Sequence, residues 1–186
     1  MRMLIASDLH GSSESLEFLL RKVEELQPDH VVLLGDLLYH GPRNCLPKYY
    51  APKGMPDNFA RLMEKTQVIA VRGNCDAEVD LFVLPFPMPD STWIVDGPRQ
   101  IYASHGHRIP EYPPMPGFEK GTIFLRGHTH VPRAEALEGF HFWNPGSITL
   151  PKQGFPRSYA VLDNGRFTVL SVDGAVLAEE TVGAAQ

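Results

Sequence analysis

The most informative part of the sequence is Thr122-Ile123-Phe124-Leu125-Arg126-Gly127-His128-Thr129-His130, an apolar run that ends in two histidines one residue apart. Two imidazoles at the end of a buried strand can face one point in space. A single pair is weak evidence, because histidines also serve as hydrogen-bonded polar groups in loops. Four other apolar runs end in similar residues: Asp8-Leu9-His10, Gly35-Asp36, Gly73-Asn74 and His105-Gly106-His107. This recurrence indicates a scaffold for one polynuclear metal site.

The first 71 residues alternate between apolar strands and helices. Residues 3–6, 31–34 and 68–71 are short, apolar and partly β-branched, as buried strands are. Leucine and valine recur at helical spacing over residues 16–26, after Ser12 or Ser13 as the cap. Asp57 can cap a second helix before Phe59. Strand, helix and strand in so short a span predict a parallel crossover unit.

The rest of the chain resembles β structure. Residues 94–103 predict a hairpin, and Asp163-Asn164-Gly165 is a strong turn signal between strands at 159–162 and 167–172. Phe140 and Phe142 alternate with His141, which predicts a surface position for His141. The tail 183–186 should fray.

Two proline-rich segments interrupt these elements. Residues 39–57 form a long loop with aromatic residues, and loops of this length in compact domains are often functional. Residues 108–117 are expected on the surface, near the histidine-rich strand ends.

The totals describe a soluble globular protein. A length of 186 residues predicts one domain over 1–186, with 43% hydrophobic and 21% charged residues. The net charge of −5 argues against nucleic acid as a partner. The two cysteines, Cys45 and Cys75, do not make a disulfide framework. The N-terminal apolar run is too short for a signal peptide or membrane span, so we expect a cytoplasmic protein.

The chemistry of these residues suits divalent metals. Ligands in open α/β sheets bind at the carboxyl ends of the strands, so the loops that follow the strands should converge. Carboxylate, amide and imidazole groups suit manganese, iron, zinc or nickel better than the thiolate sets of structural zinc sites do. These motifs supply seven candidate ligands, which exceed the four of one tetrahedral ion and fit two ions: Asp8, His10, Asp36, Asn74, His105, His128 and His130. Two ions roughly 3.5–4 Å apart can turn a bridging water into an attacking hydroxide.

The motifs resemble a known family. D-x-H-G at residues 8–11, G-D at 35–36, G-N at 73–74, H-G-H at 105–107 and G-H-T-H at 127–130 are similar in type and order to those of the calcineurin-like metallophosphoesterase superfamily. Together with residues 41–44, 72–76 and 144–147, they most resemble the small bacterial YfcE-type phosphodiesterases. The resemblance implies an α/β fold, a four-layer α/β/β/α sandwich over the whole chain.

The resemblance also implies the metal ligands. A first ion would be held by Asp8, His10, Asp36 and His130, and a second by Asn74, His105, His128 and the shared Asp36. It implies Mn²⁺ as the first choice, with Ni²⁺, Zn²⁺ or Fe²⁺ as alternatives.

Other residues are candidates for contact with the substrate. Asn74 can contact a phosphate oxygen as well as a metal. Cys75 stands where many relatives have a histidine that protonates the leaving oxygen; it either biases the enzyme towards diesters with good leaving groups or is only a small packed residue. Arg43 and His40 can bind the non-reacting part of a substrate, although Arg43 with Asn44 can equally hold the loop in place. His107 can support a ligand, contact substrate or face solvent.

The function expected is metal-dependent hydrolysis of a small-molecule phosphodiester, with Asp36, Asn74 and Cys75 at the reacting centre. One alternative is a phosphomonoesterase or nucleotidase that uses the same metals, which the ratio of activities on aryl diesters and monoesters would distinguish. The other is a protein-binding scaffold of the same fold, which would bind a partner without turnover. A homodimer through the proline-rich loops is a further hypothesis.

Overall fold

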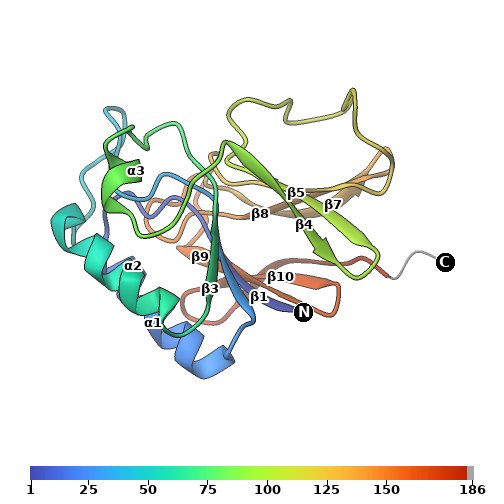
Figure 1. Ribbon diagram of the computed structural model, residues 1–186. Helices are drawn as coiled ribbons and strands as arrows, with labels where there is room; N and C mark the ends of the chain where they lie inside the picture. The colour runs from blue at the N-terminus through green and yellow to red at the C-terminus, as the bar shows by residue number, and fades with distance from the viewer. Residues whose placement is uncertain (184–186) are drawn as a thin grey trace.

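Two mixed β-sheets pack face to face in the computed structural model, which describes residues 1–183 (Figure 1). The larger sheet has six strands in the order β11-β10-β9-β1-β2-β3. The smaller sheet has five strands in the order β4-β5-β6-β8-β7. The apolar side chains between the sheets form one core cluster, which includes Ile5, Val32, Ile101 and Trp143.

The larger sheet is built around three parallel strands, β1 (Arg2–Ala6), β2 (His30–Leu33) and β3 (Gln67–Ala70). An antiparallel meander extends it through β9 (Ser158–Asp163), β10 (Arg166–Ser171) and β11 (Val176–Thr181). Alternate residues of β1 point to opposite faces: Met3 and Ile5 enter the core between the sheets, while Leu4 and Ala6 face the helices. This double burial explains why the strand is apolar throughout.

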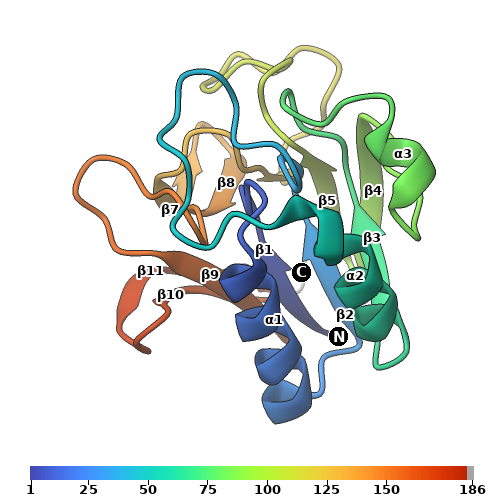
Figure 2. The same ribbon diagram turned by 90° about the vertical axis from the view of Figure 1, so that its left-hand side faces the viewer.

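Helices cover the outer face of the larger sheet (Figure 2). The helix α1 (Ser13–Leu26) begins after Ser12, whose side chain accepts a hydrogen bond from the Ser15 amide, as the sequence predicted. The helix α2 (Met55–Met63) follows the short 3₁₀ helix η1 (Pro52–Gly54). The predicted cap at Asp57 is wrong, because the helix begins at Met55 with Gly54 as its N-cap, which places Asp57 inside the first turn. One further turn is α3 (Asp80–Val83).

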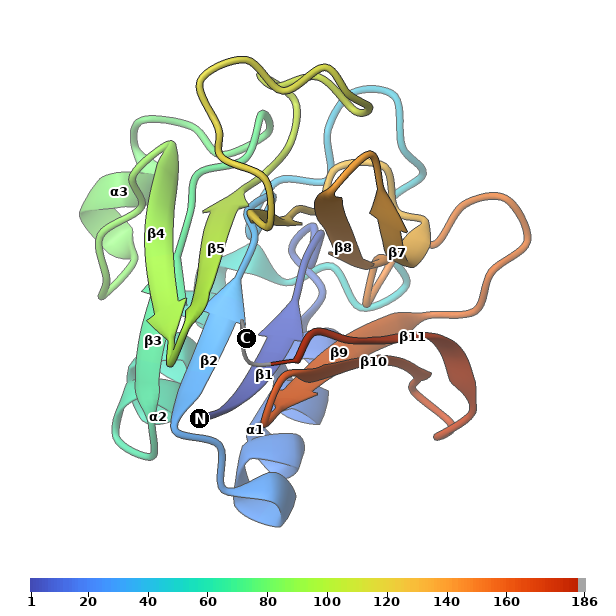
Figure 3. The same cartoon turned by 90° about the vertical axis from the view of Figure 1, so that its right-hand side faces the viewer.

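The smaller sheet consists of β4 (Ser91–Asp96), β5 (Arg99–Ser104), β6 (Ile123–Leu125), β7 (Pro132–Leu137) and β8 (Phe140–Pro145). Figure 3 shows this sheet from the side opposite the helices. Its outer face is covered by the segment 106–121, from which Met115 and Phe118 pack on Phe124 and Phe142. The predicted sandwich is confirmed, with the difference that this outer layer is irregular rather than helical.

The expected position of His141 is wrong. Phe140 and Phe142 face the outer segment, so His141 faces the other sheet, where its Nδ1 lies 2.7 Å from Glu180 Oε1. The alternation of side chains along β8 was predicted correctly. The surface position was wrong because it assumed that one face of the strand is open to solvent, whereas both faces are covered.

The loops after the strands gather at one end of the molecule. The proline-rich segments after β2 and β5 both lie at the upper end in Figures 1 and 2. Within residues 1–183, no helix is both long enough and apolar enough to cross a membrane. The tail 183–186, expected to fray, lies almost wholly outside the described residues.

Candidate metal centre

The structure brings all seven predicted ligands together. They lie in the loops that follow β1, β2, β3, β5 and β6: Asp8, His10, Asp36, Asn74, His105, His128 and His130. Five strands that are distant in the sequence therefore deliver their next polar residues to one end of the two sheets, as expected for strands whose carboxyl ends meet at one edge.

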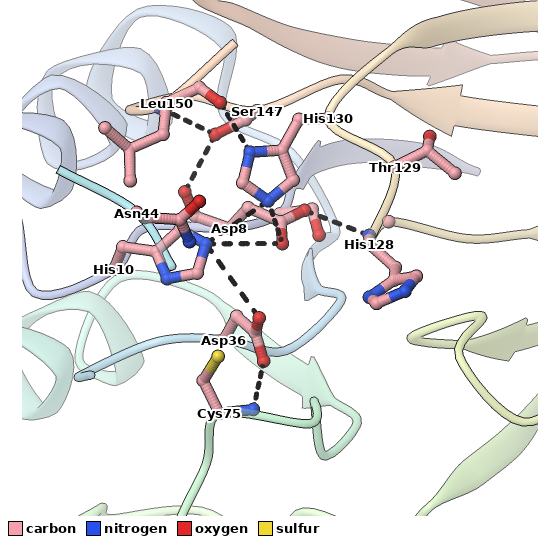
Figure 4. A network of polar contacts seen from close by, with 12 residues as sticks. Asp8, His10, Asp36, Asn44, Cys75, His128, Thr129, His130, Ser147 and Leu150 are labelled. Carbon is pink, nitrogen blue, oxygen red and sulfur yellow. Dashed lines mark hydrogen bonds and ion pairs between the residues drawn. The ribbon is translucent and has the colours of Figure 1, made fainter. Parts of the chain in front are cut away.

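The first set of side chains lies around Asp8 (Figure 4). The Nε2 atom of His130 is 3.1 Å from Asp8 Oδ1 and 3.3 Å from His10 Nε2. The Nε2 atom of His10 is 3.7 Å from Asp8 Oδ1. These three side chains point their donor atoms at one small volume, and all three are buried.

The second set lies around His105. Its Nε2 atom is 3.0 Å from Asn74 Oδ1 and 3.3 Å from His128 Nδ1. Asp36 lies between the two sets, because its Oδ2 atom is 3.9 Å from His10 Nε2 and 3.5 Å from His105 Nε2. Asp36 thus faces both groups of ligands.

Backbone carbonyls hold the outer nitrogens of three histidines. The Nδ1 atom of His10 lies 2.9 Å from the Tyr39 oxygen, and that of His105 lies 2.6 Å from the Leu34 oxygen. The Nδ1 atom of His130 is hydrogen-bonded in the same way to the carbonyl oxygen of Leu150. Because an Nδ1–H donates to each carbonyl, the neutral ring presents the lone pair of Nε2 to the centre. This is the usual outer arrangement of metal-binding histidines.

One buried atom shows that these residues fit a cation. Asp8 is completely buried, and its Oδ1 atom has no hydrogen-bond donor in acceptable geometry among the described residues. His130 Nε2 is close to it, but that nitrogen is an acceptor when Nδ1 donates to Leu150. Buried oxygen and nitrogen lone pairs that face one another are costly unless a positive charge lies between them. A divalent ion with mixed oxygen and nitrogen ligands meets that requirement.

The backbone is strained at the same residues. Five of the nine described non-glycine residues with positive φ are predicted ligands: Asp8 (58°), His10 (47°), Asp36 (55°), His128 (65°) and His130 (61°). Each left-handed residue of this kind costs of order 1 kcal/mol, and such strain is concentrated at functional sites. The backbone of these turns is therefore less stable locally, but it places the side chains at the centre.

Two glycines allow the ligand loops to approach closely. A Cβ atom on Gly73 would lie 2.1 Å from Asp36 Oδ1, and one on Gly127 would lie 1.8 Å from Ser7 Oγ and 2.9 Å from Asp8 Oδ2. Any side chain at these positions would displace a carboxylate of the centre.

Asp76 and Asn144 support the ligand loops. Asn144 was expected in a turn near the site, where it could orient a metal-bound histidine, whereas no role was expected for Asp76. The carboxylate of Asp76 accepts hydrogen bonds from the amides of Asp36, Leu37 and Gly73 at 2.7–2.8 Å. Burial raises the pKa of Asp76 to about 6 against these hydrogen bonds. Asn144 donates to the carbonyl of Gly127 at 2.8 Å and to Thr129 Oγ1 at 3.1 Å, so it holds the loop that carries His128 and His130.

Charge within the cluster shifts the pKa values of the ligands. Burial acts to raise the pKa of Asp8, but the contact with His130 and the charge on His105 outweigh burial and hold that pKa well below its ordinary value. Burial acts to lower the pKa of His105, but hydrogen bonding to Asp36 and the nearby carboxylates raise it to about 9. Burial lowers the pKa values of His10 and His128, which favours the neutral form of both rings.

Cys75 lies at the edge of the centre. Its amide donates to Asp36 Oδ1 at 2.7 Å, and its thiol accepts a 3.2 Å contact from Asn74 Nδ2. Burial and the charge of Asp36 raise the pKa of the thiol to about 12. Cys75 therefore keeps its proton at neutral pH and is a poor proton donor.

A cleft of about 680 Å³ opens over the centre. Arg43 lines this cleft and is exposed, while Asn44 holds the loop by donating to the His40 carbonyl at 2.8 Å. Lys152 also lines the cleft; no sequence signal pointed to it, because it lies in a loop outside the motifs.

The other two expected substrate contacts lie outside this cleft. The ring of His40 packs edge-on against Tyr39 and Tyr50, with centroids 4.9 Å and 5.2 Å away. His107 lies behind the centre, with its ring centroid 5.4 Å from that of His105 and 6.0 Å from that of His128. Its roles as a ligand support and as a substrate contact both stay predictions.

The chain as a whole resembles known proteins. A family model described as the calcineurin-like phosphoesterase superfamily domain matches residues 1–166. The chain belongs to this superfamily. The resemblance inferred from the five motifs is thus confirmed, and so is the expectation of a phosphoesterase.

Individual relatives of this superfamily match over nearly the whole chain. The chain is 40% identical to phosphodiesterase YfcE of Escherichia coli (strain K12) over 187 aligned positions, which cover 98% of each chain. A solved structure of E. coli YfcE, described as a phosphoesterase, superposes with a TM-score of 0.91 at 36% identity and covers 98% of this chain and 100% of the other. Vacuolar protein sorting 29 of Cryptosporidium parvum shares the fold, with a TM-score of 0.62 at 18% identity over 97% and 98% of the chains.

Proposed function

We propose that the chain is a divalent-metal-dependent phosphodiesterase with a dinuclear centre. The observation that carries this proposal is the position of Asp36, whose Oδ2 atom faces His10 on one side and His105 on the other. One carboxylate between two groups of ligands is what two neighbouring ions require. The 40% identity to a phosphodiesterase supports the choice of reaction.

The side chains fall into two ligand sets under this proposal. Asp8, His10, Asp36 and His130 would hold one ion, and Asp36, Asn74, His105 and His128 the other. We propose Mn²⁺ as the ion, since carboxylate and amide oxygens accompany the imidazoles in the donor set, with Ni²⁺, Zn²⁺ and Fe²⁺ as alternatives. When bound, two such ions would acidify the water that becomes the attacking hydroxide and would offset the charge that builds on the phosphate oxygens.

The protein itself determines which ligand atoms carry protons and which direct a lone pair at the centre. His10, His105 and His130 keep a proton on Nδ1 against a backbone carbonyl, so that Nε2 faces the centre. Asn74 turns its Oδ1 atom towards His105. One N–H of its amide donates to the Cys75 thiol, and the other can donate to a phosphate oxygen in the cleft.

The preference for diesters with good leaving groups over alkyl monoesters rests on Cys75. A thiol with a pKa of about 12 cannot readily protonate a departing alkoxide. A diester with a good leaving group needs no such proton, whereas an alkyl monoester does. The rival phosphomonoesterase or nucleotidase would use the same ligands and differ at this step.

The scaffold alternative is favoured only by likeness in fold to vacuolar protein sorting 29. In this chain all seven predicted ligand positions hold residues that can bind metal, and their donor atoms converge. We therefore propose the enzyme rather than the scaffold.

The test uses metal-stripped protein refilled with Mn²⁺, Ni²⁺, Zn²⁺ or Mg²⁺. We expect hydrolysis of bis(p-nitrophenyl) phosphate that depends on added metal, exceeds that of p-nitrophenyl phosphate, and is lost in Asp36→Asn. Asp163→Asn is the matched control, since Asp163 is remote at the β9–β10 turn and should leave turnover unchanged. A greater activity on the monoester would favour the phosphatase, and no turnover with any metal would contradict the proposed reaction.

A further inference from the structure

A second cavity lies behind the metal centre. It has a volume of about 200 Å³ and is separate from the cleft that contains Arg43 and Cys75. Its wall includes Gly127, His128 and Thr129, and His128 also lines the cleft. His128 is therefore common to the walls of both spaces, which places the cavity next to the metal centre.

The cavity contains a buried guanidinium without a carboxylate partner. Arg126 is only 6% exposed, and it donates to the carbonyls of Pro110 and Glu111 at 2.6 Å and 2.9 Å. Among the described residues, no carboxylate oxygen lies within ion-pairing distance of it, although Glu111 also lines the cavity. The remaining N–H groups of the guanidinium are available to a ligand.

A second arginine lies on the same aromatic ring. The guanidinium carbons of Arg126 and Arg133 are 5.0 Å and 4.7 Å from the centroid of Phe142. Arg133 forms an ion pair with Glu135, so of the two arginines it is Arg126 that lacks a carboxylate partner among the described residues. Burial and the charge of Arg133 lower the pKa of Arg126 to about 10, which leaves it charged at neutral pH. A buried charge without a counterion is costly, and the phosphodiester reaction does not use it.

We propose that this cavity is an oxyanion subsite of the active site, in which Arg126 binds a carboxylate or phosphate on the non-leaving substituent of the diester. This inference rests on the proposed phosphodiesterase function, because it assigns the second substituent of that substrate. A planar guanidinium fork suits both oxyanions. The shared His128 wall favours an anion attached to the substrate over a free one.

Kinetics on three matched esters test the substrate assignment. Each has p-nitrophenolate as leaving group, and the other substituent is propyl, 2-carboxyethyl or 2-phosphoethyl. For the Mn²⁺-loaded protein we expect a KM about tenfold or more lower for the two anionic esters, at similar kcat, as one charge-assisted hydrogen bond provides. Arg126→Met should lose this preference and retain turnover of the propyl ester, and Arg126→Lys should retain part of the preference.

Arg99→Met is the matched control. Arg99 also donates to a backbone carbonyl, that of Val182, but it pairs with Asp96 and lies in the β4–β5 hairpin. Its loss should leave the preference at the wild-type level. No preference in the wild type, or a preference that persists in Arg126→Met, would overturn the inference while turnover of the propyl ester would still support the phosphodiesterase.

Binding to unmodified protein gives a test that needs no turnover. Inorganic phosphate is titrated into ¹⁵N-labelled, metal-free protein, and the Nε–H resonance of Arg126 is followed. We expect a saturable shift of the Arg126 resonance and no shift of the Nε–H resonance of Arg99. An Arg126 resonance that does not shift would overturn the subsite. A shift without any kinetic preference among the three esters would mean that a free anion occupies the cavity, which would also overturn the assignment to the substrate.

Discussion

Three of the four histidines at the centre share one arrangement, in which Nδ1 faces a backbone carbonyl and Nε2 faces inward. His128 differs, because its Nδ1 atom is directed at His105 and no carbonyl holds its outer nitrogen among the described contacts. A ligand whose outer nitrogen is unsupported binds less firmly. At the scale of single residues, the ion held by His128 is therefore expected to be the weaker of the two.

The raised pKa of His105 predicts how metal affinity depends on pH. In the metal-free protein this ring has a pKa of about 9, so a divalent ion at Nε2 must displace a proton at neutral pH. Apparent Mn²⁺ affinity should therefore rise with pH, by about tenfold per unit between pH 6.5 and 8.5 for one released proton. Titration calorimetry in two buffers of different ionisation enthalpy measures both the affinity and the protons released.

His141→Gln is the control for that experiment, since His141 lies between the sheets and pairs with Glu180. It should show the same slope as the wild type. Affinity that is independent of pH, with no proton released, would contradict the assignment of His105 as a ligand.

The residue at position 75 is expected to set the ratio of monoester to diester hydrolysis. Cys75→His would place a stronger proton donor at the cleft, so hydrolysis of alkyl monoesters should rise relative to that of aryl diesters by about tenfold or more. The measurement is the ratio of the two rates at saturating Mn²⁺, with Cys45→His as control, because Cys45 is exposed. An unchanged ratio in Cys75→His would show that the cysteine is only a small packed residue.

At the scale of elements, the loop after β2 is attached to the loop after β1. Gly11 lies at their contact: its amide donates to the Leu37 carbonyl, its carbonyl accepts from the Ala51 amide, and a Cβ atom would lie 2.4 Å from the ring of Tyr50. The same loop also supplies the Tyr39 carbonyl to His10. The loop therefore supports a predicted metal ligand as well as bordering the cleft.

Gly11→Ala tests this attachment. Gly11 has a φ of 77° and Gly154 a φ of 78°, but a Cβ atom on Gly154 would meet no described atom within 4 Å. Both substitutions impose the same backbone strain, but only Gly11→Ala creates a clash. The free energy of unfolding of Gly11→Ala should fall by about 2 kcal/mol or more below that of Gly154→Ala. Denaturant titration of metal-free protein measures the difference, and equal losses would contradict the packing described.

The strands and α1 could be predicted from the sequence, because their hydrophobic period and caps are local signals. The observed bounds of β1 and β2 lie within one residue of those predicted. The orientation of β8 could not be predicted, since an alternating pattern shows that two faces differ but not which neighbour covers each face. The irregular layer over Phe124 and Phe142 was missed for the same reason.

The same limit applies to the site. Its seven candidate ligands follow strands in recognisable motifs, so their convergence could be predicted from a parallel sheet. Arg126, Asp76 and Lys152 could not be assigned a role, because what they do depends on contacts between distant segments. His40 was expected at the substrate from its place in the loop, whereas its ring packs on Tyr50.

At the scale of the whole molecule, the two sheets act as one support for the ligands. Asp8, Asp36 and Asn74 come from the larger sheet, and His105 and His128 from the smaller one. The core between the sheets fixes the distance between these two groups. The single domain over 1–186, the cytoplasmic location and a homodimer through the proline-rich loops stay predictions.

The central claim is that these side chains surround two cations rather than one or none. Anomalous diffraction from crystals grown with Mn²⁺, measured at the manganese absorption edge, tests it most directly. Two peaks per chain are predicted, roughly 3.5–4 Å apart with Asp36 between them. A single peak, or peaks away from Asp36, would contradict the account.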